Sequence, residues 1–321
     1  MNNTKFRVLV TCTPMLKSLD ECQERFKAEH LEVVAPDVGQ QLSEAELLDM
    51  VADFDGVITG DDPFTEQVLR VGRQGRLRAI VKWGIGLDAI DLDAARKLGV
   101  FVSNTPGTFN DEVADTALGY TLLLARKLHT IDTAVHQGEW PKIQGTSLRG
   151  KIAGIIGVGN IGSALARRYY VLGMELLGYD PFPIDAALRE ETGMHQVDLD
   201  ELCASADCIV LCCGLTPENY HIINPQTLAG MKEGVWIVNV ARGALIDENA
   251  LIGALEDGKI GGAALDVFES EPIDPAHPLL SYQQVIAGSH NASNTREAVS
   301  RVNQMSIDIL VRELRRLSSE P

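Results

Sequence analysis

Short apolar runs alternate with longer amphipathic segments along almost the whole sequence. The runs have the length and β-branched content of buried strands, and the segments between them have the periodicity of helices. Strands that alternate with helices pair as parallel βαβ units, with helices on both faces of the sheet. One series occupies residues 1–103 and a second begins at Lys151. We therefore expect an α/β protein with two doubly wound parallel-sheet domains.

Caps and turn residues place the ends of several helices. Ser43 and Glu46 have the spacing of a capping box, so a helix begins beside them. Another helix begins at Asp91 and ends near Gly99. The expected strands lie at 6–10, 31–34, 56–59, 77–81, 100–103, 152–156, 174–179, 208–213, 235–240, 263–267 and 285–287, and the other expected helices at 20–29, 111–128, 161–172, 198–204 and 295–317.

The charge balance limits the class of partner. Hydrophobic residues make up 45% of the 321 residues and charged residues 23%, as in an ordinary globular protein. Asp and Glu number 45 against 28 Lys and Arg, so the net charge is −17. Such a surface repels phosphates, so we expect no nucleic acid and no membrane as partner. Small anionic ligands are not excluded, because they respond to the local field of a cleft.

Neither export nor a metal site is indicated. The first 30 residues lack the apolar core of a signal peptide, and no run of about 18 apolar residues occurs. The six cysteines form no C-x-x-C pair, and the seven histidines lack H-E-x-x-H spacing. We therefore predict buried reduced thiols, no metal and a cytoplasmic location.

The string G-V-G-N-I-G at 157–162 follows an expected strand and opens an expected helix. In that context each glycine has a steric task. Gly157 permits a tight turn, Gly159 lets a pyrophosphate approach the backbone, and Gly162 lets helix and strand pack closely. A glycine-rich turn that binds no nucleotide is the alternative.

The residues after these glycines specify the nucleotide. The helix start at Asn160 and Ile161 offers free N–H groups and about half a positive charge to phosphates. Asp180 ends the next strand, where an acid accepts hydrogen bonds from the ribose hydroxyls of NAD and repels the 2′-phosphate of NADP. Residues 181–183 are Pro, Phe and Pro, so no cation follows directly. The sequence predicts NAD as cofactor.

Further motifs occur in a fixed order as far as His290. They are K-W-G-I-G-L-D at 82–88, N-T-P-G at 104–107, L-T-P-E at 215–218, V-A-R-G at 240–243, L-D-V-F at 265–268 and E-P at 271–272. With them the sequence resembles the D-isomer-specific 2-hydroxyacid dehydrogenase family, in its phosphoglycerate dehydrogenase-like branch, over nearly the whole chain. The resemblance implies a flavodoxin-like substrate-binding domain (1–103 and 290–321), a Rossmann NAD-binding domain (104–289) and an active cleft between them.

The resemblance also implies a catalytic trio of Arg242, Glu271 and His290. The Arg242 guanidinium would hold the substrate carboxylate and polarise the C2 oxygen. His290 would protonate the carbonyl in reduction and take the hydroxyl proton in oxidation, because imidazole changes its charge near neutral pH. Glu271 would hydrogen-bond the imidazole and favour its charged form. Each of the three, taken singly, is more often structural.

Other contacts are implied in the same way. Asp266 would bond the nicotinamide carboxamide, or else cap nearby backbone at a strand end. The backbone of Gly84, Ile85 and Gly86 would meet the substrate carboxylate, unless these residues form a plain turn. Lys82 would add positive charge beside them, or else be a solvated lysine. The remaining residues expected beside the cofactor are Thr216, Val240 and Ala241.

These residues predict an NAD-dependent enzyme that transfers a hydride between nicotinamide C4 and C2 of a small D-2-hydroxy acid or 2-keto acid. The model reactions are those of phosphoglycerate dehydrogenases and of hydroxypyruvate or glyoxylate reductases. A dehydrogenase for a phosphite-type oxyanion and a non-catalytic NAD(H)-sensing protein are alternatives. In the loop at 60–64, Asp61 and Asp62 stand where many relatives carry Arg-Ser, which disfavours a phosphorylated substrate.

The segment 111–128 is apolar around much of its circumference. Val113, Ala117, Tyr120 and Leu124 lie on one side of the expected helix. Such a helix must be buried in a core or against another subunit. The resemblance implies a two-fold contact, so we expect a homodimer.

Overall fold

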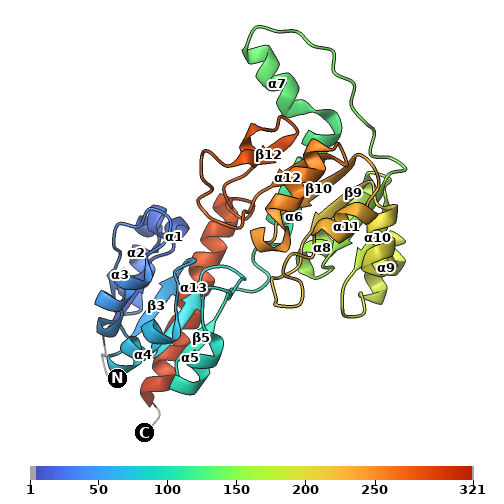
Figure 1. The fold of residues 1–321 in the computed structure, drawn as a ribbon. Coiled ribbons are helices and arrows are strands. Elements are labelled where there is room, and N and C mark those ends of the chain that lie inside the picture. Colours follow the sequence, from blue (N-terminus) through green and yellow to red (C-terminus); the bar gives the residue numbers. More distant parts are fainter. Residues whose placement is uncertain (1–4, 320–321) are drawn as a thin grey trace. The chain divides into compact units, whose positions relative to one another are not determined.

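The computed structural model describes residues 5–319, which divide into two compact units. Unit 1 comprises the described residues up to Thr108 and those from Asn294 onward, and unit 2 comprises Phe109–Ser293. Each unit contains one sheet in which all strand pairs are parallel (Figure 1). The predicted class, α/β with two doubly wound parallel sheets, is confirmed.

The boundaries between the units lie a few residues later in the chain than the resemblance implies. Thr105 stays with unit 1, since its N–H donates to the Gly84 carbonyl (3.0 Å) and its Oγ1 accepts from the Gly84 N–H (3.0 Å). His290 and Ala292 stay with unit 2, since their N–H groups donate to Asp266 (2.7 and 2.8 Å). Hydrogen bonds to Gly84 and to Asp266 thus hold these segments in their respective units.

The sheet of unit 1 has the strand order β2-β1-β3-β4-β5, which is the flavodoxin-like order. Its elements are β1 (Phe6–Val10), α1 (Thr13–Lys17), α2 (Leu19–Ala28), β2 (Leu31–Val34), α3 (Glu44–Met50), η1 (Val51–Asp53), β3 (Gly56–Thr59), α4 (Glu66–Gln74), β4 (Ala79–Lys82), α5 (Leu92–Leu98), β5 (Phe101–Ser103) and α13 (Arg296–Ser319). α13 contacts β3, β4, α1 and α2, whereas α4 contacts both α3 and α5. The helices therefore form two layers around the sheet.

α13 completes unit 1 although it comes from the distant end of the chain. A Cβ at Gly56 in β3 would lie 2.8 Å from Leu310 Cδ1, so the helix lies directly on the sheet. Trp83 Nε1 donates to Asn303 Oδ1 of the helix (2.7 Å), and Asn303 Nδ2 donates to Ser18 Oγ (2.9 Å). The buried Asn303 amide thus joins α13 to the end of β4 and to the start of α2.

The sheet of unit 2 has the strand order β12-β11-β10-β9-β6-β7-β8, a Rossmann arrangement with one strand added at an edge. Its elements are α6 (Asn110–Arg126), α7 (Leu128–His136), β6 (Ile152–Ile156), α8 (Asn160–Val171), β7 (Glu175–Tyr179), α9 (Ala186–Thr192), β8 (His195–Gln196), α10 (Leu199–Ser205), β9 (Cys208–Leu211), α11 (Pro225–Gly230), β10 (Val235–Asn239), η2 (Gly243–Leu245), α12 (Glu248–Glu256), β11 (Ile260–Leu265), η3 (Pro278–Ser281) and β12 (Val285–Ala287). α6 and α8 pack together against the sheet, and α10, α11 and α12 form another contacting group (Figure 1).

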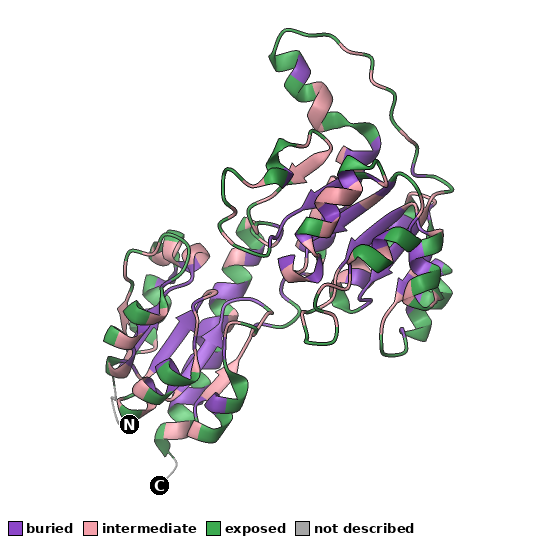
Figure 2. Ribbon diagram, viewed as in Figure 1, coloured by how far each residue is buried: buried purple, intermediate pink, exposed green. Residues whose placement is uncertain are grey.

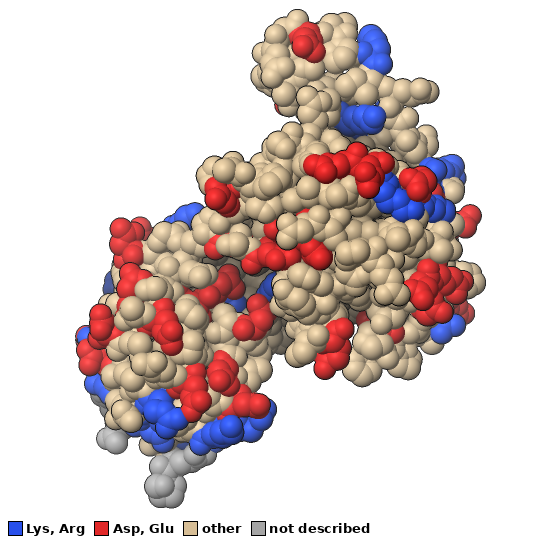
Figure 3. All heavy atoms as spheres, in the orientation of Figure 1, with Lys and Arg blue, Asp and Glu red and all other residues tan. Residues whose placement is uncertain are grey.

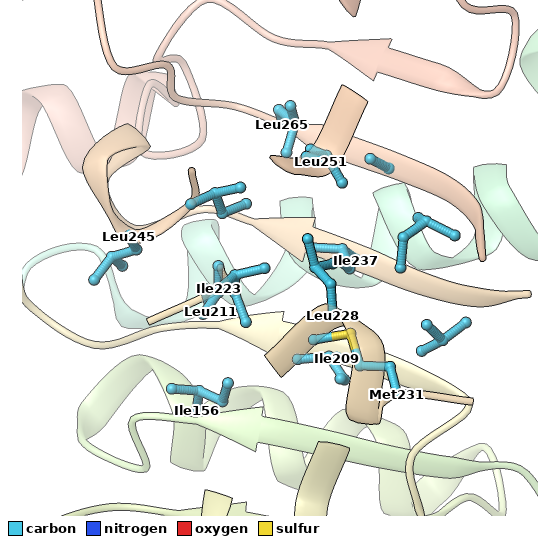
Figure 4. Close-up of a cluster of buried hydrophobic side chains, with 14 of the residues drawn as sticks. Ile156, Ile209, Leu211, Ile223, Leu228, Met231, Ile237, Leu245, Leu251 and Leu265 are labelled. Atoms are coloured by element: carbon cyan, nitrogen blue, oxygen red, sulfur yellow. The ribbon is translucent and has the colours of Figure 1, made fainter. Parts of the chain in front are cut away.

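The core of unit 2 lies between its sheet and the group α10–α12. Ile156, Leu211, Ile237 and Leu265, from four neighbouring strands, belong to one buried cluster that also includes Leu251 of α12 (Figure 4). Each is at most 1% exposed, and burying one such side chain contributes about 1.5–3 kcal/mol. Figure 2 shows the strands of both units as predominantly buried. This packing fixes the strand ends from which the loops of the site emerge.

The helix expected at 111–128 is interrupted. α6 ends at Arg126, Lys127 adopts a left-handed conformation (φ 52°), and α7 follows as a helix that the sequence did not predict. Val113, Ala117 and Leu124 are buried within unit 2, so the core accounts for that side of α6. α7 extends away from the sheet (Figure 1) and exposes Leu128 and Val135.

The surface carries the acidic excess of the sequence. Asp and Glu side chains are spread over much of the face drawn in Figure 3. Within residues 5–319, no helix is long and apolar enough to span a membrane. All six cysteines are unpaired, and four are buried, but Cys212 and Cys213 are half-buried, so the prediction of buried thiols is correct for four.

Candidate active site

Three neighbouring strands of unit 2 end at one edge of its sheet. β11 pairs in parallel with both β10 and β12, and the loops after these three strands contain Arg242, Glu271 and His290. The carboxyl ends of parallel strands are where open α/β sheets bind ligands. The fold therefore brings the loops of the predicted trio to one edge of unit 2.

His290 and Glu271 form a direct pair. The imidazole Nδ1 lies 2.7 Å from Glu271 Oε2, and the other carboxylate oxygen, Oε1, accepts the Phe268 N–H (3.0 Å). The two side chains are 29% and 26% exposed. A carboxylate fixed by backbone at one oxygen thus orients the imidazole ring through the other.

Asp266 holds the backbone around His290. It is 2% exposed; its Oδ1 accepts from Tyr120 OH (3.1 Å) and the Asn291 N–H (3.2 Å), and its Oδ2 accepts the Ala292 N–H (2.8 Å). These bonds stabilise His290 in a left-handed conformation (φ 55°), which costs a non-glycine residue free energy. Asp266 thus caps backbone at the end of its strand, which is the alternative given for it.

Burial, followed by the neighbouring Asp266 charge, raises the pKa of Tyr120 well above its ordinary value. The hydroxyl therefore stays protonated and donates a hydrogen bond to the Asp266 carboxylate. This bond joins α6 to the end of β11, so the segment that carries His290 is tied to the core of unit 2.

The turn that carries Arg242 packs against the loop that carries Glu271. Asn239 Nδ2 donates to the Arg242 carbonyl (2.8 Å), and the Ala241 N–H donates to Asn239 Oδ1 (3.0 Å). A Cβ at Gly243 would lie 1.9 Å from the carbonyl carbon of Phe268, so only glycine fits there. This close approach positions the two loops relative to each other.

The glycine string adopts the predicted strand–turn–helix geometry between β6 and α8. Gly157 has a positive φ of 90°, and a Cβ there would lie 2.5 Å from the Cys213 nitrogen. A Cβ at Gly162 would lie 2.2 Å from the Gly157 oxygen, so the helix and the turn touch. A Cβ at Gly159 would meet no described atom within 4 Å. Gly159 therefore borders open space at the N-terminus of α8.

This helix start fits a nucleotide phosphate. Gly159 is the N-cap of α8, so no side chain at this position caps the backbone N–H groups of the first turn, which starts with Asn160 and Ile161. Asp180 lies at the end of β7, where its Oδ2 accepts the Val158 N–H (2.9 Å) and its Oδ1 the Phe182 N–H (3.0 Å). The carboxylate thus stands beside the glycine turn, as a ribose-binding acid does.

The other residues expected beside the cofactor follow β9 and β10. Thr216 lies in an exposed turn, where its N–H donates to Asn219 Oδ1 (2.7 Å). Val240 is buried and Ala241 half-buried at the end of β10. β9 pairs with β6, so the Thr216 turn starts from the strand next to the one that ends in the glycine string.

The residues expected to bind substrate lie in unit 1, at the carboxyl end of β4. Gly84 has a positive φ of 124°, and Ile85 is 39% exposed in the turn that continues to Gly86. Asn104 Nδ2 donates to the Ile85 carbonyl (2.7 Å), so this turn is fixed. Lys82 lies beside this turn and is not a solvated lysine: it is 5% exposed, and its Nζ lies 2.7 Å from Asp61 Oδ1.

The side chains that hold the site loops in place, Tyr120 and Asn239, were not predicted from the sequence. Tyr120 was counted as one apolar residue of a helix, although a buried tyrosine hydroxyl requires a polar partner. Asn239 is a buried amide at the end of an apolar strand, which was a signal for a turn-holding role. Among residues 5–319, no group of three or more His, Cys, Asp or Glu side chains is placed to hold a metal ion.

Comparison with protein families gives one match. The model described as D-isomer specific 2-hydroxyacid dehydrogenase, NAD binding domain, matches residues 118–292. That range contains the glycine string and Asp180, together with the loops of Arg242, Glu271 and His290. It therefore covers the candidate site of unit 2.

Individual relatives agree with this match. D-3-phosphoglycerate dehydrogenase of Methanocaldococcus jannaschii is 40% identical over 271 residues, which are 83% of this chain and 51% of that protein. Hydroxypyruvate reductase of Thermotoga maritima is 38% identical over 291 residues, covering 89% of this chain and 92% of that protein. D-Lactate dehydrogenase of Aquifex aeolicus, in complex with NAD and lactic acid, has a TM-score of 0.83 at 26% identity, covering 94% of this chain and 93% of that one. The chain spans about half the length of the phosphoglycerate dehydrogenases it matches.

Proposed function

Because this chain belongs to the D-isomer-specific 2-hydroxyacid dehydrogenase family, we propose that it is an NAD-dependent oxidoreductase acting on a CH–OH group. Its substrate is a small D-2-hydroxy acid or the corresponding 2-keto acid, and a hydride passes between C2 and nicotinamide C4. The His290–Glu271 pair, at 2.7 Å on the ligand-binding edge of a Rossmann sheet, is the observation that carries the proposal.

The residues of unit 2 divide the proton and charge chemistry among them. NAD(H), when bound, supplies or accepts the hydride. Arg242 binds the carboxylate and polarises the C2 oxygen through charge-assisted hydrogen bonds. In reduction, His290 Nε2 gives its proton to the carbonyl oxygen and becomes neutral; in oxidation it takes the hydroxyl proton and becomes charged. Glu271 orients the ring and stabilises its charged form.

Unit 1 supplies backbone donors for the substrate in this proposal. The N–H groups of Ile85 and Gly86 bind the carboxylate, whereas the expected Gly84 N–H donates to Thr105 Oγ1 (3.0 Å) and holds the turn instead. Their fixed conformation, bonded to Thr105 and Asn104, supports this role. A turn held rigidly loses little entropy when it binds an anion.

The cofactor contacts follow the fit of the glycine turn. The pyrophosphate lies at the N-terminus of α8 beside Gly159, and Asp180 accepts the ribose hydroxyls. Asp180 also repels a 2′-phosphate, so NAD is used in preference to NADP. Asp266 positions the backbone around His290 and, in this proposal, would also accept a hydrogen bond from the nicotinamide carboxamide.

We further propose a homodimer formed through α6 and α7. The outward residues of this pair include Leu128 and Val135, which are 46% and 42% exposed, and Trp140 in the following segment is 78% exposed. Apolar side chains gathered on one projecting element are typical of a protein–protein contact. Sedimentation velocity at micromolar concentration should show a dimer, and Leu128→Asp with Val135→Asp should give monomer. A monomer for the unmodified chain would refute this.

The test of the activity is NADH oxidation with glyoxylate, hydroxypyruvate and 3-phosphohydroxypyruvate. Turnover of at least one acid is expected, and His290→Ala should lower it about 10²- to 10⁴-fold while NADH still binds. His195→Ala is the control, since this exposed histidine lies on the opposite edge strand, β8. Tight NADH binding without turnover would support a sensor instead, and NAD reduction by phosphite alone would support the oxyanion alternative.

A further inference from the structure

The carboxyl edge of the unit 1 sheet is acidic. The loops that follow its five strands are residues 11–12, 35–43, 60–65, 83–91 and 104–108, all within the described chain. They contain no Lys and no Arg. Their acids are Asp37, Asp61, Asp62, Asp88 and Asp91. An anion that approaches this edge therefore meets negative charge in the loops themselves.

The cation at this edge is Lys82, the last residue of β4, and its charge is already paired. β3 and β4 are neighbours, with Thr59 opposite Lys82, so the loop after β3 begins beside the lysine. Lys82 is 5% exposed, and its Nζ lies 2.7 Å from Asp61 Oδ1. A buried ammonium requires such a partner because its desolvation is costly. The Asp61 side chain is 41% exposed, so the negative member of the pair is the one that faces solvent.

Asp62 fixes the loop that presents Asp61. It is fully buried, and its Oδ2 accepts from Thr11 Oγ1 (2.5 Å), Thr59 Oγ1 (2.5 Å) and the Gly60 N–H (3.1 Å). Its Oδ1 accepts the Leu42 N–H (2.6 Å). With these bonds to three separate segments, the loop has one conformation, and Asp61 stays beside Lys82.

A second basic residue of unit 1 is engaged at the same time. The guanidinium of Arg301 in α13 donates two hydrogen bonds to the Thr108 carbonyl (3.2 and 2.6 Å). Its position is therefore set by the last loop of the unit. Lys82 and Arg301 are thus both bonded within unit 1, and the charged side chains of the edge loops themselves are acids.

We propose that Asp61 makes this edge selective for 2-keto and 2-hydroxy acids that carry no negative charge beyond the carboxylate, such as glyoxylate, hydroxypyruvate and glycerate. Asp61 neutralises Lys82 and repels a phosphate ester at C3, so it is a specificity-determining residue. This inference rests on the proposed function, because it concerns the substrate of that reaction. One like charge a few ångströms from a dianion changes relative affinity by about tenfold or more.

The test compares two ligand pairs. Turnover is measured with hydroxypyruvate and 3-phosphohydroxypyruvate, and binding of D-glycerate and 3-phospho-D-glycerate is measured by calorimetry with NADH present, which requires no turnover. The unmodified protein should favour the unphosphorylated member of each pair. Asp61→Asn keeps the shape of the side chain, removes its charge and unmasks Lys82, so the preference should shift at least about tenfold toward the phosphorylated member.

Two further variants make the result specific. Lys82→Met added to Asp61→Asn should cancel most of the shift, because the gain comes from the released ammonium. Asp93→Asn removes the same charge from α5, where Asp93 pairs with Arg96 on the surface, and should leave the preference unchanged. Thermal unfolding confirms that each variant is folded.

The outcomes separate the two proposals. If the unmodified protein binds the phosphorylated ligand better, if neither glycerate binds, or if folded Asp61→Asn leaves the binding ratio unchanged, the inference about Asp61 is overturned. If no keto acid is turned over, the proposed activity fails, and the calorimetric ratio still decides the role of Asp61.

Discussion

Replacing Glu271 with Gln tests whether a carboxylate charge beside His290 contributes to the reaction. Gln retains an oxygen that can accept the Phe268 N–H, so the loop keeps its main backbone bond. Unit charges about 4 Å apart attract by about 4 kcal/mol at an effective dielectric constant of about 20. Because the two side chains are 26% and 29% exposed, solvent screening reduces this to about 2 kcal/mol.

That loss corresponds to about a thirtyfold lower kcat/KM for keto-acid reduction, since reduction consumes the charged imidazole that Glu271 stabilises. The assay is steady-state NADH oxidation at pH 7, with NADH affinity measured separately by fluorescence. Glu269→Gln is the matched control: it removes an equal charge from the same loop, where Glu269 Oε1 lies 2.9 Å from His221 Nε2. If Glu271→Gln stays within threefold of the unmodified protein, or if Glu269→Gln loses as much, the argument from charge pairing is wrong.

Three other substitutions or modifications have defined outcomes. Gly162→Ala places a Cβ 2.2 Å from the Gly157 oxygen and should lower the free energy of unfolding by about 2 kcal/mol, seen as a lower Tm, whereas an unchanged Tm would contradict the close packing. Gly159→Ala, which meets no described atom within 4 Å, should leave Tm nearly unchanged but weaken NADH binding at least about tenfold in a fluorescence titration. Burial raises the pKa of Cys213 to about 11 from 9.0, so its alkylation by iodoacetamide at pH 8 should be about a hundredfold slower than that of a free thiol and should accelerate with rising pH; rapid labelling would refute this.

Local features of the sequence were enough to predict the strand–turn–helix geometry of the glycine string. Each glycine of the 157–162 string has a steric requirement that can be read from its neighbours, and the observed close approaches match it. Helix starts at Ser43 and Asp91 were predicted for the same reason, since a cap acts within three residues, and both side chains accept the expected N–H.

Features that depend on distant contacts were not predictable in this way. The strand expected at 263–267 starts earlier, at Ile260, because Gly261 and Gly262 concealed its beginning. Glycine is a poor strand former, but a Cβ at Gly261 would lie 2.5 Å from the Gly234 oxygen. Likewise, α6 and α7 are separated by Lys127, which adopts a left-handed conformation. Glycine or asparagine ordinarily occupies such a position, so nothing in the sequence marked the break.

The protein partners of two charged residues were not predictable for the same reason. Asp266 and Lys82 stand in motifs that implied ligand contacts, and in the structure they also contact Tyr120 and Asp61, which are remote in sequence. A motif specifies a residue's position at a strand end. Only the tertiary packing decides which neighbour its charge meets.

The chain leaves the first unit after Thr108 and returns to it only at Asn294, so α13 supplies one layer of a sheet whose strands are synthesised long before it. During translation unit 2 can complete its own sheet before α13 is synthesised. Until α13 emerges, the face of β3 and β4 that it covers stays exposed. Unit 1 is thus synthesised first but completed last. Its strands are therefore the ones most exposed to aggregation during translation.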